Sequence, residues 1–121
     1  MNIEIDYQGK PLTIHLTRGA EAALRQRTTP LVAEMELYFS CMIRKRVRFH
    51  TVVRHDRTVL VADNLCVGFR PVMTEQCRID GARDDEVALT DFPIARRVAY
   101  LPSWLRIDFR QGEWLGEFGY L

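Results

Sequence analysis

Residues 34–50, which read EMELYFSCMIRKRVRFH, carry the pattern that decides the fold of this chain. Apolar and polar residues alternate along them, and a repeat of two is typical of a β-strand with one buried and one wet face. The odd positions are apolar except for Lys45, so we expect them to face the core. The even positions are mainly charged or polar, and we expect them to face water.

The length of this alternating stretch predicts an interruption within it. At about 3.3 Å per residue a straight strand of this length would measure about 53 Å, which is too long for a domain of this mass. We therefore expect a bulge or a break near residues 40–42, although no Gly, Pro, Asn or Asp marks it. Lys45 on the apolar face indicates either a sheet edge or a shift of register at a bulge.

The N-terminal segments predict a hairpin followed by a helix. Residues 3–16 alternate on both sides of a turn at residues 7–10, as in a β-hairpin. The Thr17 hydroxyl can accept a free amide hydrogen of a first helical turn, so we expect a helix over residues 18–27. Pro30 disfavours helix in the residue before it and ends this segment.

The rest of the chain predicts more strands than helices. Residues 58–62 and 65–69 are typical of strands, whereas the acidic, turn-rich residues 74–91 are typical of a surface loop. A short helix is expected between residues 91 and 101. Residues 105–120 alternate around a second hairpin turn.

Composition limits the class of protein. The chain has 121 residues and a mass of 14.1 kDa, which is enough for one hydrophobic core but not two. We therefore predict an α+β fold, mostly antiparallel β-sheet with one or two short helices, as a single compact domain over residues 1–121. The net charge of +1 and the 47% of hydrophobic residues exclude a disordered chain and a strongly basic nucleic-acid binder.

The sequence also predicts a location in the cell. No apolar run approaches the roughly 20 residues of a membrane span, and residues 1–6 lack the basic and apolar regions of a signal peptide. Three cysteines, odd in number and widely spaced, argue against a disulfide framework and favour a reducing compartment. We expect a soluble cytoplasmic protein with no membrane partner.

Positive and negative charges are segregated along the chain. Residues 41–57 contain six basic residues and one acidic residue, whereas residues 74–91 contain six acidic and two basic residues. The small net charge therefore results from the cancellation of a +5 segment and a −4 segment. A local anionic site is compatible with this balance, and neutralisation of one segment by the other is the rival explanation.

Three arginines of the alternating stretch are candidate anion-binding residues. Arg44, Arg46 and Arg48 would project from one strand face about 6–7 Å apart, close to the spacing of neighbouring phosphates along a nucleic-acid strand. We expect this row to bind an anionic partner, either an acidic protein or a nucleic acid. The alternative is internal pairing of the arginines with carboxylates of the chain, for which Glu34, Glu36, Glu75 and Asp84–Glu86 are available.

Known catalytic signatures are missing, so we predict that the protein is not an enzyme. The sequence has no Gly-rich phosphate loop, no Gly-x-Ser-x-Gly, no His-Glu-x-x-His and no Cys-x-x-Cys. One open alternative is a nucleophile pair of Cys41 with His50 or His55. Another is a ligand groove near Trp104 and Trp114.

The three cysteines are interpreted as core residues first and as metal ligands second. Cys41 falls on the apolar face of its strand, and Cys66 lies among apolar neighbours. Cys66 and Cys77 are eleven residues apart, a spacing that matches neither structural zinc nor cluster motifs. We therefore expect no cofactor, with a metal or an iron–sulfur cluster as the alternative.

The run LTRGAEAALR at residues 16–25 resembles the strand-to-helix opening of the HesB-like A-type iron–sulfur carriers, which have a similar Leu-Thr-x-x-Ala run. The helix is followed by a strand up to Cys41 and by another strand, so the resemblance covers about residues 12–70. The family's glycines around its first cysteine and its C-terminal Cys-Gly-Cys are missing here. The resemblance implies a diverged HesB-like fold. It also implies an alternative function, a metal or iron–sulfur cluster assembly accessory protein using Cys41 with Cys66 or Cys77.

The sequence as a whole predicts a small cytoplasmic binding or accessory module. Arg44, Arg46 and Arg48 would contact its anionic partner. An amphipathic strand with a charged edge could also pair across a homodimer, so the oligomeric state stays open.

Overall fold

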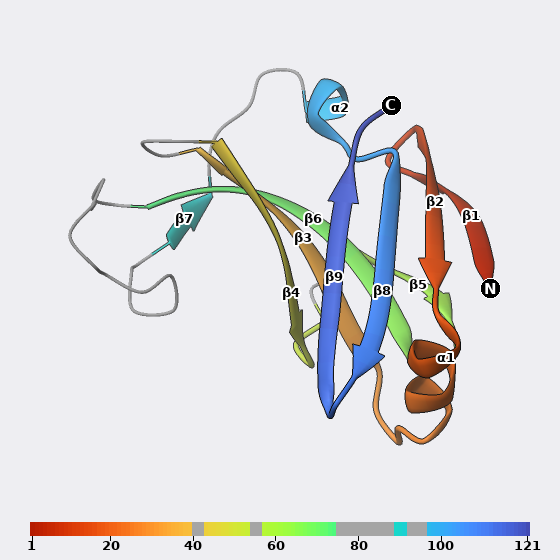
Figure 1. Ribbon diagram of the computed structural model, residues 1–121. Helices are drawn as coiled ribbons and strands as arrows, with labels where there is room; N and C mark the ends of the chain where they lie inside the picture. The colour runs from red at the N-terminus through yellow and green to blue at the C-terminus, as the bar shows by residue number, and fades with distance from the viewer. Residues whose placement is uncertain (40–42, 54–56, 75–88, 92–96) are drawn as a thin grey trace.

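The computed structural model describes residues 1–39, 43–53, 57–74, 89–91 and 97–121. Nine strands in this part of the chain form two sheets that face each other (Figure 1). The front sheet contains, in spatial order, β1 (Asn2–Tyr7), β2 (Lys10–Leu16), β8 (Trp104–Arg110) and β9 (Glu113–Gly119). The back sheet contains β4 (Ile43–His50), β3 (Leu31–Phe39), β6 (Leu65–Thr74) and β5 (Thr58–Ala62), and β7 (Leu89–Asp91) pairs with β6. The helices are α1 (Arg18–Arg25) and α2 (Arg97–Tyr100).

Both predicted hairpins are confirmed, and so is the first helix, which ends at Arg25 instead of residue 27. β1 pairs antiparallel with β2 through a turn in which Gln8 and Gly9 have positive φ, and β8 pairs antiparallel with β9 through Gln111 and Gly112 in the same way. The Thr17 hydroxyl accepts a hydrogen bond of 3.2 Å from the amide of Ala20, as expected of an N-cap.

The long alternating stretch is interrupted where its length predicted. β3 ends at Phe39 and β4 begins at Ile43, and the two strands pair antiparallel, so the chain reverses its direction between them. Residues 40–42 themselves lie outside the described residues. β4 is an edge strand with an unbroken register, and Lys45 therefore lies at a sheet edge rather than at a register shift.

The fold is broadly α+β, as predicted, but one mostly antiparallel sheet is too simple a description. The strands divide into two sheets, and β2/β8 and β3/β6 are parallel pairs. Parallel partners are joined by crossover connections, and the alternation within a strand carries no information on such partners. The loop expected over residues 74–91 is also wrong at both of its ends, because β6 extends to Thr74 and residues 89–91 form β7, while residues 75–88 lie outside the described part. A helix was expected between residues 91 and 101, and within the described part of that range α2 is helical.

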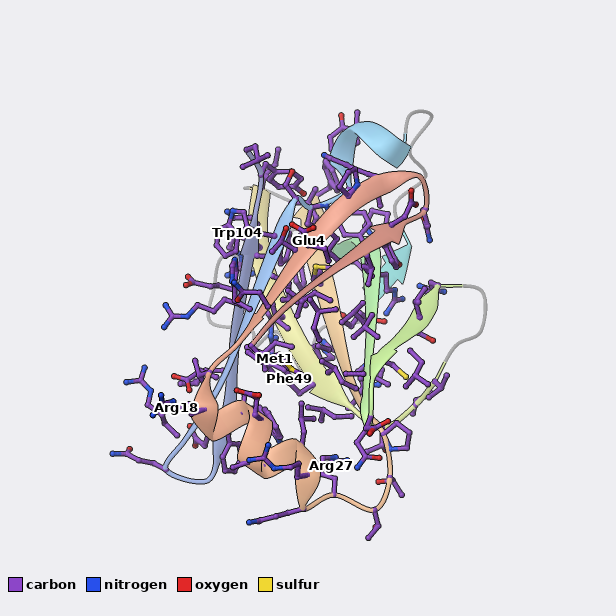
Figure 2. All side chains as sticks on the ribbon, turned by 90° about the vertical axis from the view of Figure 1, so that its right-hand side faces the viewer. Met1, Glu4, Arg18, Arg27, Phe49 and Trp104 are labelled. Carbon is purple, nitrogen blue, oxygen red and sulfur yellow. The ribbon has the colours of Figure 1, made fainter. Side chains whose placement is uncertain are left out.

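The hydrophobic core lies between the two sheets. Figure 2 shows the side chains that fill this space, and it places α1, between the labelled Arg18 and Arg27, across one end. Ala20 and Leu24 are the buried residues of this helix. Buried core residues of the sheets include Leu12, Ile14, Leu105 and Ile107 from the front sheet and Met35, Val67 and Phe69 from the back sheet.

The two sheets also touch along one side, where β4 lies beside β9 (Figure 1). A Cβ atom on Gly116 would lie 2.9 Å from Cζ of Phe49 and 2.9 Å from Cβ of Val47, so this close approach needs glycine. The Trp114 ring stacks on Phe49 at 5.9 Å between ring centroids and lies 4.7 Å from the Phe109 ring. Trp114, one of the two residues of the expected ligand groove, therefore packs against the core.

Candidate functional site

The candidate site is the outer face of the back sheet, which we call the polar face. It consists of the residues of β4, β3 and β6 whose side chains point away from the front sheet. The register places them in four rows across the strands: Arg44, Tyr38 and Val72; Arg46, Glu36 and Arg70; Arg48, Glu34 and Gly68; His50, Val32 and Cys66. Each row brings together residues that are distant in the sequence, and two of the rows place arginine and glutamate side by side.

The two glutamates of β3 are buried, although the sequence predicted that they face water. Glu36 is 0% exposed and Glu34 is 3% exposed. Tyr38, on the same face, is also buried. β3 is an inner strand with β4 on one side and β6 on the other, and alternation along a single strand carries no information on such neighbours. On β4, an edge strand, Arg44 and Arg46 are exposed as expected. Ile43 was expected to face the core, but it is exposed as well.

The carboxyl group of Glu36 has an unusual environment. Tyr38 Oη donates a hydrogen bond of 2.9 Å to Oε1, and Nε of Arg48 lies 3.5 Å from the same oxygen. The second oxygen, Oε2, has no hydrogen-bond partner among the described residues. Burial raises the pKa of Glu36 to about 7, and the neighbouring Glu34 carboxyl raises it as well, while Tyr38 and Arg48 act in the opposite direction. Glu36 therefore exchanges its proton near neutral pH.

The predicted arginine row is partly engaged within the chain. Arg48 contacts Glu36, and the guanidinium of Arg44 lies 5.8 Å from the centroid of the Tyr38 ring. Arg46 stands opposite Glu36 in the register and also interacts within the chain. Internal pairing, which the sequence left as the alternative, thus holds for Arg48, while all three arginines remain on one face.

His50 faces the other glutamate. Its Nε2 lies 3.8 Å from Oε2 of Glu34, and its Nδ1 accepts a hydrogen bond of 3.2 Å from the amide of Val52. Because Nδ1 accepts, the hydrogen of a neutral ring is on Nε2, the nitrogen that faces the carboxylate. The Val52 amide therefore orients this ring toward Glu34.

A cavity of about 200 Å³ opens on the polar face and is lined by Glu34, Arg48, His50, Val52 and Arg70. Arg48 comes from β4 and Arg70 from β6, so two arginines on opposite sides of β3 reach the same cavity. Sequence reasoning missed Arg70. The alternation along β6 could have placed Arg70 on one face with Cys66 and Gly68. Only the parallel pairing of β6 with β3 places Arg70 opposite Glu36.

A second cavity, of about 230 Å³, lies on the outer face of the front sheet and has a different charge pattern. Arg106 stands opposite Glu117, and Nε of Arg110 lies 2.9 Å from Oδ2 of Asp108. The lining therefore has two arginines and two carboxylates, so its charges balance. This balance makes it a weaker candidate for binding ions and a suitable control surface.

The described residues add little to the metal hypothesis. Cys66 is 5% exposed, and burial raises the pKa of its thiol, which favours an unreactive core cysteine. Cys41, Cys77 and His55 lie outside the described residues. Within the described ranges, no three His, Cys, Asp or Glu side chains come together as metal ligands. The metal or iron–sulfur site that uses Cys41 with Cys66 or Cys77 stays a prediction.

Replacing Cys66 by serine is expected to lower the free energy of unfolding by about 1 kcal/mol, because a buried hydroxyl needs a hydrogen-bond partner more than a thiol does. Urea denaturation of both forms measures this change, and elemental analysis of the purified proteins measures bound metal. Stoichiometric iron or zinc in the wild type that is lost from Cys66→Ser would show instead that Cys66 is a ligand.

Comparisons with protein-family models, with curated proteins and with solved structures found no match for this chain. The resemblance to the HesB-like carriers therefore stays a prediction. Neither α1 nor α2, nor any other helix within the described part, has the length and apolar character to cross a bilayer.

Proposed function

We propose that this chain is a small binding module that holds an anionic partner on its polar face, with Arg44, Arg46 and Arg48 as contact residues. The observation that carries the proposal is the excess of cations among the described residues of this face. Four arginines, the three of β4 and Arg70 of β6, stand beside two glutamates of β3. The face keeps a formal charge of +2 from these groups even when both carboxylates are ionised.

Neutralisation by Glu34 and Glu36, the described carboxylates of this face, offsets only part of this charge. Glu36 binds its proton near neutral pH, because burial raises its pKa to about 7, so it offsets less than one full cation there. Arg44 and Arg46 are exposed at the sheet edge, where a long anionic chain can reach them. Exposed charges separated by more than a Debye length of about 8–10 Å are screened, so such a partner must bind close to the row.

Anisotropy measurements with a labelled single-stranded oligonucleotide and with a labelled Glu-rich peptide test the proposal. Changing Arg44, Arg46 and Arg48 together to Gln is expected to weaken binding at least about tenfold at low salt. It should also reduce the slope of log Kd against log salt by about 2 for the oligonucleotide, since each lost phosphate contact removes about 0.7. Glutamine keeps most of the side-chain length, so the polar face stays covered.

The matched control changes three exposed arginines elsewhere, Arg18, Arg25 and Arg106, to Gln. Both triple variants have the same net charge, and the control should bind within about twofold of the wild type. An equal loss in both variants, or no binding of either probe at low salt, would overturn the proposed function.

A further inference from the structure

The cavity on the polar face is built from opposite charges that converge from three strands. Arg48 on β4 and Arg70 on β6 flank β3, and Glu34 on β3 lines the cavity between them. Neighbouring strands are about 4.8 Å apart and the two arginines are offset by two residues along the strands, so their backbones are about 12 Å apart and both long side chains can reach one small ligand. The contact between Nε of Arg48 and Glu36 at 3.5 Å orients the Arg48 guanidinium.

The size of the cavity selects small ligands. Its volume of about 200 Å³ is below the roughly 300–1,000 Å³ of sites that hold drug-sized molecules. Arginine guanidiniums donate paired hydrogen bonds to planar or tetrahedral oxyanions. A single oxyanion group therefore fits both the volume and the two arginines.

Glu34 decides which oxyanion fits. An ionised carboxylate only accepts hydrogen bonds, and a fully deprotonated anion such as sulfate also only accepts them, so the two repel each other. An anion that carries an O–H can donate that hydrogen to Glu34 while its other oxygens accept from Arg48 and Arg70. Phosphate monoesters, whose second pKa is about 6, still carry this hydrogen in part at neutral pH.

We propose that the cavity lined by Glu34, Arg48 and Arg70 binds one hydrogen-bearing oxyanion of the phosphate or phosphate-monoester class and discriminates against sulfate and phosphodiesters. This inference rests on the proposed function and names the chemical group that the cavity recognises, while the exposed Arg44 and Arg46 outside the cavity contact the rest of the anionic partner. A phosphodiester lacks the second ionisable oxygen, so within an oligonucleotide only a terminal phosphate would enter.

Isothermal titration calorimetry with inorganic phosphate and with sulfate, near neutral pH and at equal ionic strength, tests the inference. Phosphate is expected to bind wild-type protein at least about tenfold more tightly than sulfate. Glu34→Gln places an amide, which both donates and accepts, in the same position. We expect this variant to lose the preference, because the amide can donate to sulfate.

Two more variants separate a binding role from a structural one. Arg70→Gln should weaken phosphate binding at least about tenfold, whereas Arg106→Gln in the charge-balanced cavity of the front sheet should leave it unchanged. A Glu34→Gln protein that is fully folded and still prefers phosphate, or equal affinity of the wild type for both anions, would overturn the inference. Either result leaves the proposed function standing if the triple arginine variant still loses binding.

Competition experiments distinguish the sources of the phosphate group. A phosphoserine peptide and a nucleoside monophosphate are each titrated against bound inorganic phosphate, with an oligonucleotide that has no terminal phosphate as the reference. Displacement by either monoester, but not by the reference, supports the inference and identifies the source. Equal displacement by the reference would contradict the discrimination against diesters.

Discussion

The free energy of unfolding is expected to fall by about 3 kcal/mol as the pH rises from 4.5 to about 8, because Glu36 is buried with its pKa raised to about 7. Below pH 4.5 the carboxyl is protonated in both states and contributes no pH dependence. Between 4.5 and about 7 the unfolded chain releases this proton and the folded chain keeps it, so rising pH favours unfolding. Above about 7 both states are ionised and the loss is complete.

Urea denaturation at several pH values across this range measures the effect, with Glu36→Gln as the test variant. The Gln side chain cannot ionise but still accepts the hydrogen bond from Tyr38, so the fall of about 3 kcal/mol that Glu36 causes should be missing from this variant over the same range. Glu117→Gln, an exposed carboxylate of the front sheet, is the matched control and should keep the wild-type slope. Identical slopes for the wild type and Glu36→Gln would contradict the prediction.

Asp108 is a second carboxylate with a shifted pKa, and it affects the free energy of unfolding below pH 4.5. A hydrogen bond from the Thr17 hydroxyl, 2.6 Å from Oδ1 of Asp108, lowers the pKa of Asp108, and the Phe109 amide and Arg110 act in the same direction. A depressed pKa stabilises the folded state above the unfolded pKa and loses that contribution on acidification. Asp108 therefore affects the stability at acid pH and does not contribute to the loss of stability between pH 4.5 and 8.

Tyr7→Phe is expected to lower the free energy of unfolding by about 3 kcal/mol. Tyr7 is 1% exposed, and its hydroxyl accepts a hydrogen bond of 2.8 Å from the amide of Phe69 and donates one of 2.6 Å to the carbonyl oxygen of Arg57. It thus links β1 of the front sheet to the back sheet. Phenylalanine keeps the ring but leaves two main-chain groups without their partner, at about 1–3 kcal/mol each.

Tyr120→Phe is the matched control for this prediction. The Tyr120 hydroxyl also donates to a main-chain carbonyl, that of Tyr100, at 2.7 Å, but this bond is exposed and water can replace it. We expect a change within about 0.5 kcal/mol, measured by urea denaturation under the same conditions. Equally small effects of both substitutions would show that the Tyr7 bridge does not stabilise the contact between the sheets.

Much of the fold could be predicted from local patterns. The hairpins and the Thr17 cap depend on interactions between residues close in the sequence. The interruption near residues 40–42 follows from the length of the alternating stretch, which exceeds the size of the domain. Lys45 indicated either a sheet edge or a register shift, and the structure decides for the edge. Arg44, Arg46 and Arg48 were placed on one face because a period of two fixes the relative direction of their side chains in any strand.

The candidate cavity could not be predicted, because it depends on which strands become neighbours. Arg70 joins the arginines of β4 only through the parallel pairing of β6 with β3, which links positions more than thirty residues apart. Alternation shows which residues share a face of a strand, but it carries no information on what flanks that face.

The sequence by itself determined most of the strands, which of their residues share a face, and the row of arginines, since these follow from backbone geometry and the order of side chains. Only the tertiary structure decided that β3 is an inner strand, and this buries Glu34 and Glu36 on a face that its alternation assigned to water. Burial removes the carboxyl groups from solvent and raises the pKa of Glu36 to about 7. The titration expected near neutral pH is therefore a property of the strand order and not of the local sequence.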